Sequence, residues 1–299
     1  MNTTEIPLKD PAVSAAAGDT EQLERAYIDA STRVPVLMFY TSAIAWLIVG
    51  TILAMVVSFK LHSPDLLSGI SFITWGRLRP AHMNVMVYGW ASMAGMGTAV
   101  WLMARLCRVT LRFPLLLAAG AVFWNVGVLI GVGAILLGDS TGFQWLEFPR
   151  YVAVILFVAY TLMASWAVLM FRHRRGDQIY ITQWFLLGAF LWFPWLYAAG
   201  QLMLFVVPVQ GVLESAVTWW YANNLLFLWF GAIALGSYMD REGRRAHRSE
   251  REGHSRNPAS AREARLDRRW QRRRHSARQA AKARQCVRAV RAARTADRF

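Results

Sequence analysis

The chain has 299 residues, of which 56% are hydrophobic and only 17% are charged, and its formal net charge is +15. A soluble domain of this length normally carries more charge and fewer aromatic residues, so the composition argues against a soluble enzyme. Residues 241–299 contain 19 Arg and one Lys against six acidic residues, so almost all of the net positive charge lies there. Cys107 and Cys286 fit neither a disulfide framework nor a metal site, and both are expected to be unpaired thiols.

Six apolar runs are long enough to cross a bilayer, which takes about 20 residues each. Backbone polar groups in lipid must be satisfied within the segment, so these runs predict helices. The fold class is therefore all-α, a polytopic transmembrane bundle with about six spanning helices. It divides into a cytoplasmic N-terminal segment (1–34), a transmembrane domain (35–240) and an Arg/Ala-rich tail (241–299), disordered or helical. The six spans are predicted at about 36–59, 81–104, 114–137, 150–171, 182–207 and 213–238.

Basic residues predict the orientation of this bundle. The loops after the second and the fourth predicted span contain three Arg each, and cytoplasmic loops carry an excess of Arg and Lys. Both termini are therefore expected in the cytoplasm of a multi-pass protein of the plasma membrane. Arg77 and Arg79 are exceptions, because they fall on the outer side. The six cytoplasmic arginines are Arg105, Arg108, Arg112, Arg172, Arg174 and Arg175.

His82 is the only histidine at membrane depth, at the outer start of the second predicted span. An ionisable or metal-binding group inside a span is a functional candidate. The plain alternative is a histidine that hydrogen-bonds a neighbouring helix. Three acidic residues near the membrane, Asp139, Glu147 and Glu214, form no obvious pair, and Glu214 is expected at the outer interface.

The residues that precede His82 carry a recognisable motif. Residues 75–82 read Trp-Gly-Arg-Leu-Arg-Pro-Ala-His, and they resemble the second-helix motif of cbb3-type cytochrome c oxidase subunit I, in the haem-copper oxidase superfamily. The resemblance covers about 35–240, the N-terminal half of such a subunit. It implies that His82 is an axial ligand of the low-spin haem b and that Arg77 and Arg79 lie near the haem propionates. Imidazole suits haem iron, and Arg binds carboxylates in a bidentate manner.

A second match lies in the sixth predicted span. Residues 218–224 read Thr-Trp-Trp-Tyr-Ala-Asn-Asn and resemble a family motif in which the position of Asn223 is a histidine ligand of the active-site copper. An amide oxygen is a poor copper ligand, so the match supports the fold and argues against copper in this chain. Asn223 and Asn224 are instead expected to hydrogen-bond across helices.

Most ligands of a complete oxidase site have no counterpart in this sequence. Family members continue with further spanning helices that carry these ligands, whereas residues 241–299 contain one Leu and no Ile and cannot cross a membrane. An Arg- and Ala-rich stretch of this kind is typical of out-of-frame translation of GC-rich DNA. The first hypothesis is therefore a subunit truncated or frameshifted near codons 238–242, and the alternative is a genuine tail on a short protein.

The resemblance implies a terminal respiratory oxidase, which oxidises cytochrome c and reduces oxygen to water, but this chain is not expected to be active alone. Its expected cofactor is haem b in an incomplete site. Expected partners are other oxidase subunits, including c-type cytochromes, and membrane lipid. Nucleic acid is disfavoured because the basic tail has no recognition motif. The alternatives are a non-catalytic scaffold or transporter-like subunit and a nitric-oxide-reductase-like relative.

Overall fold

The structure is a computed structural model that describes residues 11–175 and 179–242, with side chains described from residue 20 onward. Throughout these residues the secondary structure is helical and contains no strand. Six helices are long and apolar enough to cross a membrane. The prediction of an all-α transmembrane bundle is confirmed. The predicted structure of the tail and the state of Cys286 lie outside the described residues.

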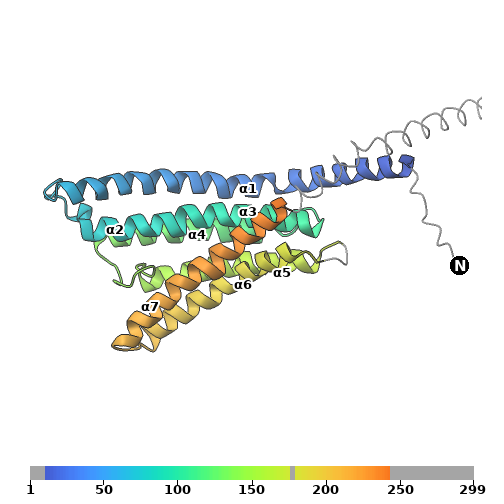
Figure 1. Ribbon diagram of the computed structural model, residues 1–299. Helices are drawn as coiled ribbons and strands as arrows, with labels where there is room; N and C mark the ends of the chain where they lie inside the picture. The colour runs from blue at the N-terminus through green and yellow to red at the C-terminus, as the bar shows by residue number, and fades with distance from the viewer. Residues whose placement is uncertain (1–10, 176–178, 243–299) are drawn as a thin grey trace, which may run out of the picture. The chain divides into compact units, whose positions relative to one another are not determined.

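The six spans consist of the α-helices α1 to α7, three π-helices and a further helical segment over residues 231–242 (Figure 1). The second span contains α2, a π-helix and α3, and the last two spans each contain a π-helix. The α-helices are α1 Pro11–His62, α2 Trp75–Asn84, α3 Ser92–Cys107, α4 Pro114–Leu137, α5 Arg150–Arg172, α6 Ile181–Gln201 and α7 Val212–Asn224. The π-helices are Val85–Ala91, Leu202–Val206 and Leu225–Phe230.

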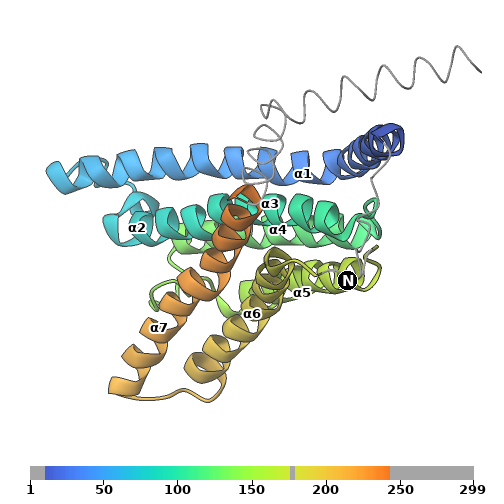
Figure 2. The same ribbon diagram turned by 45° about the vertical axis from the view of Figure 1, so that its right-hand side comes forward.

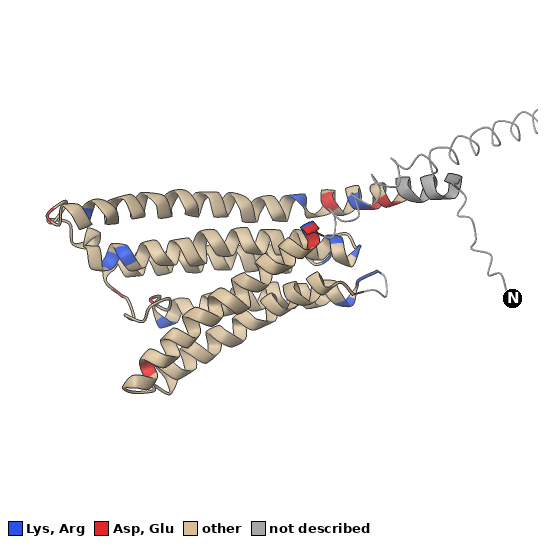
Figure 3. Ribbon diagram, viewed as in Figure 1, with Lys and Arg blue, Asp and Glu red and all other residues tan. Residues whose placement is uncertain are grey.

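Helices that follow one another in the chain pack side by side. The α1 helix lies along α2 and α3, and α4 packs against α5. The α6 and α7 helices run together and diverge from α1 to α4 at one end, as two views show (Figures 1 and 2). Lys and Arg gather near the ends of the helices, and the middles of the spans carry none (Figure 3).

The α1 helix begins far earlier than the apolar run that predicted it, because contacts at its polar end hold it in place. Asp29 accepts hydrogen bonds from Arg105 Nε at 2.9 Å, from Arg105 Nη2 at 2.8 Å and from Trp101 Nε1 at 3.1 Å. Glu24 pairs with Arg108 at 2.8 Å. Hydropathy marks the part of a helix that lies in lipid, so it missed these additional turns.

Large aromatic side chains fill the core where α4, α5, α6 and the last span meet. Trp124, Tyr160, Phe193 and Trp229 are fully buried and pack ring against ring. Trp229 Nε1 donates to Tyr160 Oη at 2.6 Å, so the polar atom of the indole is satisfied inside the bundle. Cys107 is buried and unpaired, as predicted.

Candidate functional site

His82 lies two turns into α2 and is partly buried. Its Nδ1 lies 2.9 Å from the carbonyl oxygen of Gly50 on α1. A carbonyl only accepts, so Nδ1 carries the proton of the neutral ring and donates it. The lone pair of a neutral ring is then on Nε2. A backbone carbonyl that fixes the tautomer in this way is the usual second partner of a histidine that binds a metal.

A glycine lies at this contact. A Cβ atom at Gly50 would lie 2.7 Å from Met86 Sδ and 3.1 Å from Val85 Cγ1. A side chain at position 50 would therefore require Met86 and Val85 of the π-helix to shift. Without a side chain there, α1 packs closely against the second span beside His82.

The backbone changes from α-helix to π-helix three residues after His82, over Val85–Ala91. Two side chains bond to carbonyl oxygens of this segment: Ser92 Oγ donates to Val87 O at 2.6 Å, and Trp124 Nε1 donates to Tyr88 O at 2.7 Å. Short π-helical segments within α-helices are frequent at functional sites. Apolar periodicity contained no signal for this segment, because the run is apolar on every face.

The structure separates the two predicted propionate ligands. Arg77 Nη1 donates to Leu136 O at 3.2 Å, at the C-terminal end of α4, where a cation is favourable. Arg79 is exposed, and its guanidinium carbon lies 5.6 Å from the ring centre of Trp75. Neither arginine forms an ion pair with a carboxylate of the described residues. Arg79 and His82 are three positions apart and so lie on one face of α2.

Glu147 is one of the three acidic residues that the sequence places near the membrane, and sequence reasoning gave it no role. It lies in the loop between α4 and α5, is only 8% exposed, and accepts a hydrogen bond from Asn84 Nδ2 at 2.8 Å. Burial raises the pKa of the Glu147 carboxyl, while the bond from Asn84 and the charge of Arg79 act in the opposite direction. Its only sequence signal was an acidic residue next to the start of a span.

A pair of tyrosines connects the π-helix Val85–Ala91 to α7 beside this loop. Tyr88 Oη donates to Trp145 O at 2.5 Å and lies 2.8 Å from Tyr221 Oη, so Tyr221 donates to Tyr88. Both side chains are buried. Tyr221 is also the one buried residue of α7, so this hydrogen bond joins the helix to the rest of the bundle.

The expectation that Asn223 and Asn224 hydrogen-bond across helices is wrong. Asn223 Nδ2 donates to Trp219 O at 2.8 Å, and Asn224 Nδ2 donates to Trp220 O at 2.7 Å. Each amide therefore bonds to its own helix, one turn back. On the neighbouring α6, the ring of Trp195 packs edge-on against Trp220.

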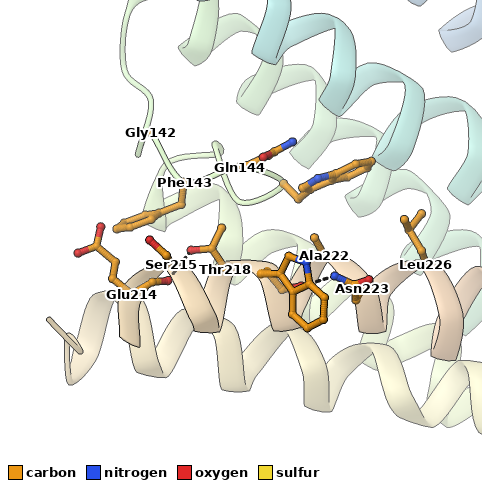
Figure 4. Close-up of a pocket in the computed structure, with 11 residues that line it drawn as sticks. Gly142, Phe143, Gln144, Glu214, Ser215, Thr218, Ala222, Asn223 and Leu226 are labelled. Carbon is orange, nitrogen blue, oxygen red and sulfur yellow. Dashed lines mark hydrogen bonds between the residues drawn. The ribbon is translucent and has the colours of Figure 1, made fainter. Parts of the chain in front are cut away.

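Asn223 lines a groove between α7 and the loop that precedes α5 (Figure 4). The groove has a volume of about 490 Å³, and His82 is not among its residues. Within the described part of the chain no three His, Cys, Asp or Glu side chains come together. The haem and copper assignments therefore stay predictions. The lining residues are Gly142, Phe143, Gln144, Trp145, Glu214, Ser215, Thr218, Trp219, Ala222, Asn223 and Leu226.

Comparison with known proteins decides the family. Residues 34–240 match the family model described as cytochrome c and quinol oxidase polypeptide I. This chain belongs to that family. The match covers more than half of the chain and confirms the resemblance seen in the sequence to subunit I of a haem-copper oxidase. It ends at residue 240.

The relatives are bacterial subunits of the same kind. The chain is 25% identical over 210 residues to the cbb3-type cytochrome c oxidase subunit CcoN1 of Stutzerimonas stutzeri, which covers 67% of this chain and 44% of the relative. It is 26% identical over 235 residues to cytochrome c oxidase subunit 1 of Rhodobacter capsulatus, and this match covers 73% of this chain and 42% of the relative. The chain thus spans about two fifths of the length of these relatives.

Proposed function

We propose that this chain is the part of a terminal-oxidase subunit I that holds one side of a haem b site, with His82 as the axial ligand. The observation that supports this most strongly is the bond between His82 Nδ1 and Gly50 O at 2.9 Å. It leaves Nε2 as the ring atom available to iron, and it fixes the orientation of the ring. The same bond also fits the alternative of a histidine that only joins two helices, and haem binding separates the two.

The residues around His82 fit one face of a haem. Nε2 supplies a strong axial donor, and Arg79, one turn away on the same face of α2, has no carboxylate partner among the described residues. Arg79 is the better candidate for a propionate, because Arg77 already donates to the end of α4. The iron would supply electron transfer when bound. The protein would contribute the axial ligand His82, the carbonyl of Gly50 that sets its tautomer, and the cation Arg79.

His82 is the one axial ligand that the sequence motif assigns to this chain. A low-spin haem needs two strong axial ligands, so the chain alone would supply one of them. Oxygen reduction therefore belongs to a complete assembly with other oxidase subunits, including c-type cytochromes, in the plasma membrane with both termini cytoplasmic. The non-catalytic scaffold reading is the alternative, and haem binding separates the two.

A titration of the purified chain with haem b in detergent tests this proposal. The wild-type chain is expected to show a saturable change in the Soret band. His82→Ala should lose it, and His62→Ala, which removes an exposed histidine at the C-terminal end of α1, should keep it. Equal binding by wild type and His82→Ala would rule out His82 as the ligand. No binding by any of the three proteins would favour the scaffold reading.

A further inference from the structure

The α6 helix carries an apolar groove with a volume of about 410 Å³ on its exposed side. Trp184, Trp192 and Trp195 are exposed there, and no charged residue lines the groove. Gly188 leaves the space open, because a Cβ atom at this position would meet only Trp192, at 3.6 Å or more. The remaining lining residues are Leu187 and Leu191.

The groove is about as long as one leaflet of a bilayer is deep. It begins at Trp184 in the first turn of α6 and reaches Trp195. Eleven residues of α-helix are about 16 Å long. Half of a hydrocarbon layer about 30 Å thick is about 15 Å. The groove therefore runs from one end of the span to the middle of the membrane, which is the depth that one acyl chain occupies.

The width of the groove also suits a single hydrocarbon chain. Spread over about 16 Å, a volume of about 410 Å³ gives a cross-section of about 26 Å², whereas an α-helix about 10 Å across covers about 80 Å². A helix of another protein is therefore too wide to enter it.

Three arginines lie just before α6 in the chain, at the end of the bundle where the groove begins. Arg172 is the last residue of α5, and Arg174 and Arg175 follow it. Arg172 and Arg175 are exposed. None of the three pairs with a carboxylate of the described residues. Like charges so close together repel one another, so an anion at this place would stabilise them.

Arg174 connects this basic cluster to the groove through two aromatic rings. Its guanidinium carbon lies 4.6 Å from the ring centre of Phe171, which lies 5.9 Å from the ring centre of Trp184. Nη1 of Arg174 donates to Phe171 O at 3.2 Å, and its Nε is buried without a hydrogen-bond partner in the described part of the chain. The guanidinium is thus held beside the mouth of the groove with donors left unused.

We infer that the end of α5 and the outer side of α6 bind an anionic phospholipid. Its phosphate lies at Arg174, and one acyl chain lies in the groove between Trp184 and Trp195. Guanidinium groups form strong charge-assisted hydrogen bonds with phosphate oxygens. A zwitterionic lipid fills the same groove but gains less from the three cations. The inference requires neither haem binding nor oxidase activity, so it can fail independently of the proposed function.

Photolabelling in phosphatidylcholine vesicles tests this inference. The full chain is reconstituted with a trace of phosphatidylglycerol or phosphatidylcholine that carries a diazirine in one acyl chain, and labelled peptides are mapped by mass spectrometry. The exposed face of α1 around Ile48 is the internal control. Residues 241–299 attract anionic lipid to the whole chain, so the measured quantity is the ratio of label on residues 184–195 to label on this face.

The ratio should be at least about fivefold higher for phosphatidylglycerol than for phosphatidylcholine, since one basic residue near a membrane surface contributes about this factor. Arg174→Gln should bring the ratio for phosphatidylglycerol close to that for phosphatidylcholine. Arg33→Gln removes the same charge from an exposed position on α1 and should leave the ratio unchanged. Gly188→Leu fills the groove and should reduce α6 labelling by both lipids, while α6 stays folded because Leu favours a helix more than Gly does.

Four results would overturn the inference. Equal ratios for the two lipids in the wild-type chain would exclude a site for anionic lipid. Equal effects of Arg174→Gln and Arg33→Gln would exclude Arg174 as the phosphate ligand. Full labelling of Gly188→Leu would show that the acyl chain lies elsewhere. If neither lipid labelled α6, a second copy of the chain would cover the groove instead.

Discussion

Two helices lie at the edge of this bundle, and their exposed faces differ in chemistry. Within the most apolar 18-residue stretch of α1, only 11% of the residues are buried. The outward side chains of this helix include Ile44, Ile48, Ile52 and Met55. In the span of α7 the corresponding share is 22%, yet its exposed groove carries Ser215, Thr218 and Asn223. Exposure alone therefore does not identify an interface in a membrane protein, because an apolar face is covered by lipid and a polar one is not.

The inner faces of the two helices differ as well. The α1 helix packs closely against the second span at Gly50, Gly89 and Gly97, and it is fixed at its polar end by Asp29 and Arg105. The α7 helix depends on one buried residue, Tyr221. Four substitutions, with effects on stability that are expected to decrease in turn, test how these helices and the loop between α4 and α5 are held.

Tyr221→Ala should remove the main attachment of α7. Deleting a buried aromatic ring costs about 3–5 kcal/mol of the free energy of unfolding, and here it also leaves Tyr88 without its hydroxyl partner. Thermal unfolding in detergent, with limited proteolysis of the α6–α7 loop, measures the effect. Trp219→Ala is the control, since this side chain on the same helix is 70% exposed and should matter little. Equal losses in both variants would show that α7 has no dominant anchor.

Gly89→Ala should separate α1 from the π-helix Val85–Ala91. A Cβ atom at this position would lie 2.7 Å from Cγ and 2.9 Å from Cβ of Trp46, and an indole cannot move away cheaply. Overpacking of this kind costs about 1–3 kcal/mol, measured by thermal unfolding. Gly133→Ala on α4 is the matched control, because nothing lies within 4 Å of its Cβ position. If Gly89→Ala left the unfolding temperature unchanged, α1 would pack at this position less tightly than the distances indicate.

Glu147→Gln should flatten the pH dependence of stability. The folded state raises the pKa of Glu147, so it holds the proton more tightly than the unfolded chain does. The stabilisation that comes from this tighter proton binding is complete below the ordinary glutamate pKa. It is lost as the pH rises through the pKa of Glu147 in the folded state. Wild type should therefore lose stability with rising pH in this window, and Glu147→Gln should lose less. Melting temperatures across a pH series check this, and parallel curves would show that burial does not perturb this carboxyl.

Asp29→Asn should have the smallest effect, under about 1 kcal/mol, because its pair with Arg105 is partly exposed. The bidentate geometry and the added bond from Trp101 should still make the effect measurable at low salt by thermal unfolding. Glu21→Gln breaks the more exposed pair with Arg25 and should change nothing. If both variants behave alike, the polar end of α1 is not fixed by Asp29.

Sequence reasoning predicted the spans well because membrane insertion depends on apolar runs, which periodicity and length reveal directly. It placed the start of α1 too late, since the polar turns around Asp29 are held by contacts from α3 that no local pattern shows. It also missed the π-helix after Asn84 and the burial of Glu147, which depend on packing between distant segments. The hydrogen bonds of Asn223 were predicted wrongly, because composition does not reveal which acceptor is nearest.

We expect His82 to present Nε2 to a haem iron. The most direct test replaces His82 with glycine and then supplies free imidazole. His82→Gly removes the imidazole and leaves room for a free one in the same place. If His82 is the ligand, this variant loses the Soret change on addition of haem b and regains it when imidazole is added. Imidazole should not increase the Soret change of His62→Gly. A variant that binds haem b equally with and without imidazole would contradict the assignment of His82.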